Sequence, residues 1–84
     1  MSPVVFRYRG YKFHFFANEG TPREPAHIHV TKDGTDAKFW LWPDVTVAYN
    51  DGYDQRTLRT LVALVIERRT VIDEAWNEFF GEAD

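Results

Sequence analysis

Cysteine is absent from the sequence, serine occurs once, and there is no long run of apolar residues. A chain without cysteine forms neither disulfide bonds nor a thiolate zinc site, and this composition fits a reducing compartment. Because the one serine is Ser2, at the terminus, we do not expect a Ser-His-Asp triad. No apolar segment approaches the ~20 residues that span a bilayer, and the N-terminus lacks a signal-peptide pattern. We therefore expect a cytoplasmic protein that does not enter a membrane.

Aromatic residues, by contrast, make up 17% of the 84 residues, and they supply much of the area that a core can bury. This length suits one domain, which we expect to extend over residues 1–84. The net charge of −3 is unevenly spread. Residues 1–42 hold six basic and four acidic side chains, whereas residues 43–84 hold four and nine. The first half also contains all three histidines, and its basic balance suits an anionic partner.

Runs of aromatic and β-branched residues predict five short strands, at residues 4–8, 11–17, 27–32, 37–42 and 45–49. A helical pattern of apolar residues follows from Gln55 to about Phe80, after Asp54 as N-cap and before Gly81 as a stop. We predict an α+β fold, in which an antiparallel sheet of four or five strands packs against one long C-terminal helix. At ~1.5 Å per residue this helix would span about 39 Å. This length exceeds what a domain of this size needs. The helix would therefore either bend or break near residues 68–70, or pack its end against a second subunit.

Two tight turns predict how the strands pair. The turn at Arg9-Gly10 sets Val5 opposite His14, on the face of the first hairpin that points away from the predicted core. A two-residue loop between Asp33 and Asp36 closes the second hairpin. The pairing predicted from this loop joins two histidines to two tryptophans, His29 to Trp40 and His27 to Trp42.

Two histidines stand two residues apart in the segment Pro25-Ala26-His27-Ile28-His29-Val30. Alternate residues of a strand point to the same face, so His27 and His29 would present their imidazoles side by side. Aligned imidazoles can bind a metal, transfer protons or contact phosphate. They can also be ordinary residues of a solvated sheet face, and this reading remains the alternative.

Four segments in this order resemble those of a known family: the His27-Ile28-His29 segment, Ala37-Lys38-Phe39-Trp40-Leu41 with Pro43, Gly52-Tyr53, and Glu74-Ala75-Trp76-Asn77-Glu78-Phe79-Phe80. From about Val5 to Gly81 the chain resembles small bacterial proteins catalogued as domain of unknown function 4160. That family usually has proline where Ala26 stands. The resemblance implies a genomic setting, because such proteins are often encoded beside a second small protein in toxin–antitoxin-like pairs. It transfers no catalytic residues.

Metal binding is one hypothesis for the two histidines. His27 and His29 would be two ligands, and His14 or Glu24 the third, if the two hairpins share a sheet. Neutral imidazoles suit zinc, nickel, copper or iron. We expect no cofactor, and a divalent metal is the alternative.

RNA cleavage is a second hypothesis. His27 and His29 would act as general base and general acid, and a cation would stabilise the developing charge, with Lys38, Arg23 or Lys12 as the candidates. Trp40 and Trp42 would stack on bases. The overall negative charge argues against an RNA partner, because contacts of cations with phosphates dominate nucleic-acid affinity.

Protein binding without chemistry is the third hypothesis and the one that we favour. The partner would be the small protein encoded by the neighbouring gene, and a homo-oligomer is an alternative. Whether the chain is an enzyme stays open at this point. The predicted functional face consists of His14, His27, His29, Lys38, Trp40 and Trp42.

Overall fold

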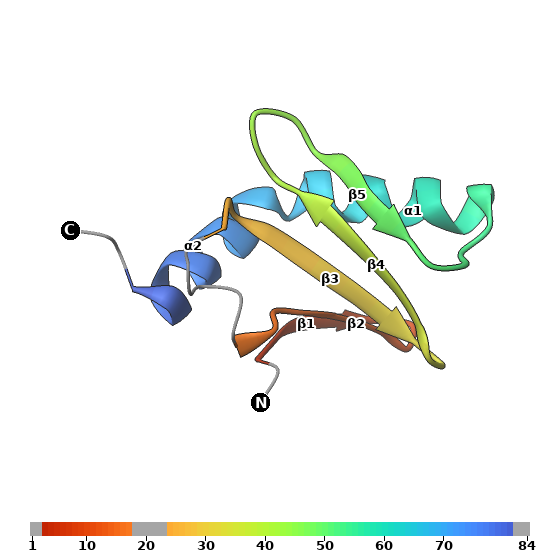
Figure 1. Ribbon diagram of the computed structural model, residues 1–84, viewed down its shortest axis with the longest axis horizontal. Helices are drawn as coiled ribbons and strands as arrows, with labels where there is room; N and C mark the ends of the chain where they lie inside the picture. Colours follow the sequence, from red (N-terminus) through yellow and green to blue (C-terminus); the bar gives the residue numbers. More distant parts are fainter. Residues whose placement is uncertain (1–2, 18–23, 82–84) are drawn as a thin grey trace.

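The computed structural model describes residues 3–17 and 24–81, which form a five-stranded antiparallel sheet and two helices (Figure 1). The elements are β1 (Val4–Tyr8), β2 (Tyr11–His14), β3 (His27–Lys32), β4 (Thr35–Trp40), β5 (Thr46–Asn50), α1 (Gln55–Glu67) and α2 (Arg69–Phe80). The strands lie side by side in chain order, from β1 at one edge to β5 at the other. The predicted α+β class and antiparallel sheet are confirmed.

The core lies between the sheet and the helices. Alternation along β3 and β4 directs Ile28, Val30 and Phe39 toward α1, where they meet Leu61 and Val65. All five side chains have no exposed surface. Burial of side chains of this size contributes roughly 1.5–3 kcal/mol each, and this contribution holds α1 against the sheet.

The prediction of one long helix is wrong, because two consecutive helices meet at Arg68, within the region where a break was considered. The cause is that the two helices pack against different parts of the sheet. While α1 covers the back of the sheet, α2 carries Trp76 to the end where β3 begins (Figure 1). There the Trp76 ring lies 5.3 Å from the Phe15 ring and 4.7 Å from the His27 ring, between centroids. One straight helix could not place Leu61 and Val65 in the core behind the sheet and also bring Trp76 against Phe15 and His27.

Two consecutive arginines fix this junction. The guanidinium of Arg68 lies 4.7 Å from the centre of the Phe6 ring in β1, and that of Arg69 lies 4.3 Å from the Trp42 ring. An Nη1–H group of Arg69 also donates to the carbonyls of Leu41 and Pro43, both at 3.3 Å. Arg68 therefore attaches the junction to β1, and Arg69 attaches it to the connection between β4 and β5.

The first hairpin has the predicted pairing of Tyr8 with Tyr11, but Val4 rather than Val5 lies opposite His14. The cause is a β-bulge at Val5, which inserts one extra residue and so shifts the pairing beyond it. The side chain of Val5 packs against the core, while Val4 is 40% exposed. The strand β2 ends at His14, earlier than predicted.

The second hairpin has its register shifted by two residues from the prediction. His29 lies opposite Lys38, and His27 lies opposite Trp40. The turn is Asp33-Gly34, and φ is +52° at Asp33 and +82° at Gly34. Positive φ at both central residues is typical of a type I′ turn, which favours Asp-Gly. A shift of two residues returns every side chain to its original face, so the predicted faces persist.

A second bulge lies at the opposite edge of the sheet. Across from the consecutive residues Lys38 and Phe39 of β4, the strand β5 has Ala48 as an extra residue between Val47 and Tyr49. Both edge strands therefore carry a bulge.

Neither α1 nor α2 combines the length and the apolar character that a membrane-spanning helix requires.

Candidate functional site

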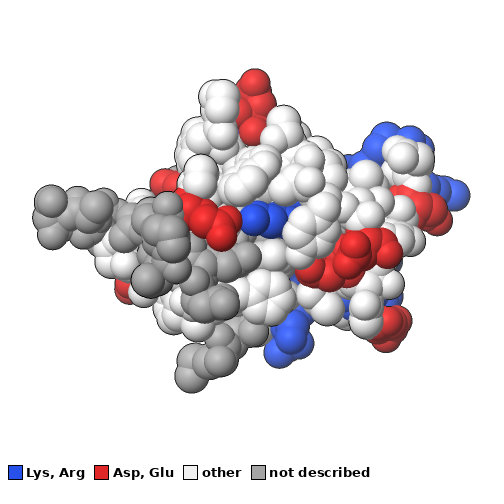
Figure 2. Space-filling model, viewed as in Figure 1, with Lys and Arg blue, Asp and Glu red and all other residues white. Residues whose placement is uncertain are grey.

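One face of the sheet points away from α1, and we call it the open face (Figures 1 and 2). Strand pairing brings polar and aromatic side chains from all five strands onto it. They are Arg7, Lys12, His14, His27, His29, Thr31, Asp36, Lys38, Trp40, Thr46 and Tyr49. Five of the six residues predicted for the functional face thus lie together here, and Trp42 is the exception.

A chain of hydrogen bonds crosses the open face from β2 to β4. The hydroxyl of Thr31 donates to Oδ1 of Asp36 at 3.2 Å. Because the single hydrogen of this hydroxyl is donated to the carboxylate, its oxygen accepts a hydrogen bond from the Nε2–H of His14, at 2.8 Å. His14 is only 2% exposed, so this bond satisfies a polar group that water barely reaches.

The other oxygen of Asp36 continues the chain toward β5 and β3. The hydroxyl of Tyr49 donates to Oδ2 of Asp36, and the oxygen of this hydroxyl lies 3.3 Å from Nδ1 of His29. That ring nitrogen is also 3.6 Å from Oδ2 of Asp36. The Asp36 carboxylate therefore lies at the centre of the network, and both of its oxygens are engaged.

Burial lowers the pKa of His14 below its ordinary value of 6.5. The neighbouring imidazole of His29 and the ammonium of Lys12 act in the same direction, although more weakly, whereas a hydrogen bond to the carbonyl of Phe15 opposes them. The 3.4 Å contact of Nδ1 with the carbonyl of Phe15 would need a second ring proton, so a neutral His14 keeps only the shorter bond, which its Nε2–H donates to Thr31.

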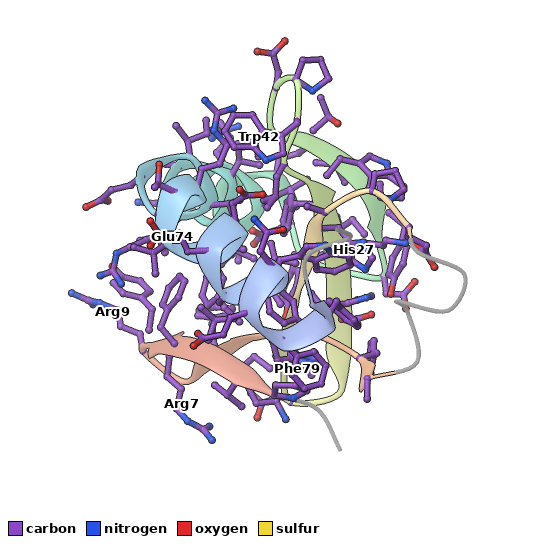
Figure 3. All side chains as sticks on the ribbon, turned by 90° about the vertical axis from the view of Figure 1, so that its left-hand side faces the viewer. Arg7, Arg9, His27, Trp42, Glu74 and Phe79 are labelled. Atoms are coloured by element: carbon purple, nitrogen blue, oxygen red, sulfur yellow. The ribbon has the colours of Figure 1, made fainter. Side chains whose placement is uncertain are left out.

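His27 occupies the end of the open face, under α2. It has no exposed surface, and its Nδ1–H donates to the carbonyl of Pro25 at 2.9 Å. Its ring is enclosed by the rings of Trp76 and Trp40, at centroid distances of 4.7 and 5.5 Å. Figure 3 shows His27 beside α2. This histidine is placed as a core residue.

Lys38 lies at the centre of the open face, between two aromatic side chains. Its Nζ is 4.4 Å from the centre of the Trp40 ring, and Tyr49 is its cross-strand neighbour. The same Nζ forms an ion pair with Oε1 of Glu24 at 3.0 Å. The predicted placement of Lys38 beside Trp40 agrees with this geometry.

Trp42 does not join the open face, and its predicted pairing with His27 is wrong. Because the register is shifted, β4 ends at Trp40, and the chain turns toward α2 before Trp42. The Trp42 indole N–H donates to Oδ1 of Asp73 in α2 at 3.0 Å. In Figure 3 Trp42 lies at the top of the molecule, apart from His27. The tryptophan therefore attaches the β4–β5 connection to α2.

The three imidazoles are buried too deeply for a substrate or a metal ion to reach them in this arrangement. His14 and His29 are each 2% exposed, and a reacting phosphate has to come within hydrogen-bond distance of a general acid or base. In residues 3–17 and 24–81, no three histidine, aspartate or glutamate side chains are arranged to hold a metal ion. Arg23, one of the cations considered for RNA cleavage, lies outside these residues. The metal and RNA hypotheses stay predictions.

Comparison with known families matches residues 10–77 to a family described as a domain of unknown function, DUF4160. This match spans most of the sequence. The chain belongs to the DUF4160 family. Searches of curated proteins and of solved structures found no match. The resemblance seen in the sequence is thus confirmed, and the toxin–antitoxin setting of this DUF4160 protein stays a prediction.

Three members of the network were missed as functional candidates: Thr31, Asp36 and Tyr49. Thr31 and Asp36 lie next to the second hairpin turn, where polar residues are ordinary. Tyr49 becomes a neighbour of His29 only because β5 pairs with β4 and β4 with β3. An acidic residue two places after the segment Thr31-Lys32-Asp33-Gly34 carries no sequence signal of this kind.

Proposed function

We propose that this DUF4160 protein is a protein-binding component of a toxin–antitoxin-like pair and that it binds its partner through the open face. The observation that carries the proposal is that aromatic side chains of this face lie above its hydrogen-bonded polar side chains. We call Phe16, Trp40 and Tyr49 the aromatic rim, and His14, Thr31 and Asp36 the polar floor. Tyr49 is 39% exposed, and Trp40 and Phe16 are half-buried. The Phe16 ring lies 4.4 Å from the ring of His29, between centroids, so it lies over the open face.

The polar floor makes this face suitable for a protein partner. Burying a polar group costs free energy unless it is hydrogen-bonded. Here Asp36 and His14 already have partners within the sheet. A partner that covers the face therefore buries aromatic surface without leaving these groups unpaired. Tryptophan and tyrosine in such positions commonly supply most of the binding energy of an interface.

RNA cleavage through the same histidines has less support. Two observations favour it, because Asp36 orients His14 through Thr31 and lies next to His29. However, the imidazoles would have to be uncovered before a phosphate could reach them. Protein binding asks for no such rearrangement.

Binding of the neighbouring gene's product tests the proposal, with calorimetry on the two purified proteins. Trp40→Ala should weaken the complex about tenfold or more, which corresponds to ~1.4 kcal/mol. Trp42→Ala is a matched control, because it removes the same side chain two residues away, outside the open face.

Two results would contradict the proposal: the absence of a complex at micromolar concentration, and a complex weakened by Trp42→Ala but not by Trp40→Ala. Circular dichroism on both variants checks that each remains folded.

A further inference from the structure

Among residues 3–17 and 24–81, the cationic side chains of the open face are not matched by an equal set of acidic ones. Arg7 and Lys12 lie directly opposite each other across β1 and β2. Like charges at directly opposed positions of a sheet are destabilising. In the described part of the chain, neither forms an ion pair with an acidic residue. This pair therefore does not serve the stability of the sheet itself.

The two acidic residues of the same region do not offset these cations. Asp36 is engaged on both oxygens by Thr31 and Tyr49. Glu24 forms an ion pair with Lys38, in which Oε1 lies 3.0 Å from Nζ. The open face thus combines two unpaired cations with a third whose only ion-pair partner in residues 3–17 and 24–81 is the 39%-exposed side chain of Glu24.

The spacing of the cations suits an extended chain segment. From the pairing, Lys38 is two strands away from Lys12 and two residues along. With strands ~4.8 Å apart and ~3.3 Å per residue, this separation is roughly 12 Å. A segment of a few residues spans such a distance, and it would pass close to the Phe16 ring, which lies 4.4 Å from the ring of His29.

We infer that the open face binds an acidic segment of the partner protein, whose carboxylates pair with Arg7 and Lys12 and displace Glu24 from Lys38. This inference rests on the proposed function and names the partner's chemistry. RNA is the other polyanion that such cations attract. The net charge of −3 and the acidic residues of α2 oppose a long uniform polyanion more than a short acidic segment.

The test measures the affinity for the neighbouring gene's product at about 50 and 300 mM salt, because salt screens exposed charges. Arg7→Gln with Lys12→Gln should weaken binding about tenfold at low salt and flatten the salt dependence. Arg56→Gln with Arg59→Gln is the matched control, since it removes the same charge from exposed positions of α1, behind the sheet. This control should change the affinity less than about twofold.

Two further variants separate recognition from folding. The Arg7 and Lys12 double variant should keep or raise the melting temperature of the free protein, because it removes a repulsive pair. Glu24→Gln should strengthen binding severalfold, because it leaves Lys38 to the partner alone.

The inference is overturned if both double variants weaken the complex equally, if neither does, or if Glu24→Gln weakens it. It is also overturned if single-stranded RNA, and not the protein, binds in a manner that depends on Arg7 and Lys12. A complex that depends on Trp40 but not on charge leaves the proposed function standing. If the wild-type proteins form no complex, both fail.

Discussion

Replacing Thr31 with valine removes the hydroxyl that joins His14 to Asp36, while it keeps the shape and the strand preference of the side chain. The Nε2–H of His14, now 2.8 Å from a hydroxyl oxygen, would face a methyl group in a site where the residue is 2% exposed. A buried donor without a partner costs ~1–3 kcal/mol, and the lost bond to a carboxylate adds about 1.5 kcal/mol. We therefore expect destabilisation by about 2.5–4.5 kcal/mol. For a domain of this size, that lowers the melting temperature by roughly 10–35 °C.

Thr46→Val provides the matched control for this change. Thr46 also lies in the sheet, opposite Trp40, but its side chain is exposed. Its replacement should alter the free energy of unfolding by no more than about 0.5 kcal/mol. Urea denaturation of both variants gives the comparison. Equal, small effects would refute the reasoning, because they would show that the network does not stabilise the fold.

Three further predictions address other parts of the molecule. Since burial lowers the pKa of His14 below 6.5, the unfolded chain binds this proton first. The free energy of unfolding should thus fall as the pH drops below about 6.5, and urea midpoints should show a smaller fall for His14→Gln. Burial also raises the pKa of Tyr53 to about 12. Titration followed by tyrosinate absorbance should therefore show one tyrosine that ionises near this pH, and the Tyr53→Phe variant should lack this step. Trp76→Ala should cost ~3–5 kcal/mol in thermal melts, much more than Trp42→Ala, because Trp76 is 2% exposed.

The faces of the sheet were predictable from alternation, even where the register was not. The error in the second hairpin was two residues, and a slip of two returns each side chain to its own face. His27, His29, Lys38 and Trp40 therefore lie together as expected. The predicted turn lies one residue too late, between Asp33 and Asp36, although Asp33-Gly34 matches the Asp-Gly preference of the type I′ turn that forms.

Tertiary effects account for what the sequence did not reveal. A bulge such as the one at Val5 depends on how its side chain fits the core and has no local pattern. The end of α1 at Arg68 is set by contacts of two arginines with Phe6 and Trp42, which are distant in the chain. The position of Tyr49 against Asp36 likewise required the order of the strands.

The paired bulges at Val5 and Ala48 have a consequence for self-association. An exposed edge strand is a template onto which another chain can add, and repeated addition leads to fibrils. A bulge interrupts the regular spacing of donors and acceptors that such addition needs. With both margins interrupted, the sheet ends at five strands. A molecule that displays uncovered aromatic rings can in this way remain available to a different protein without polymerising with its own copies.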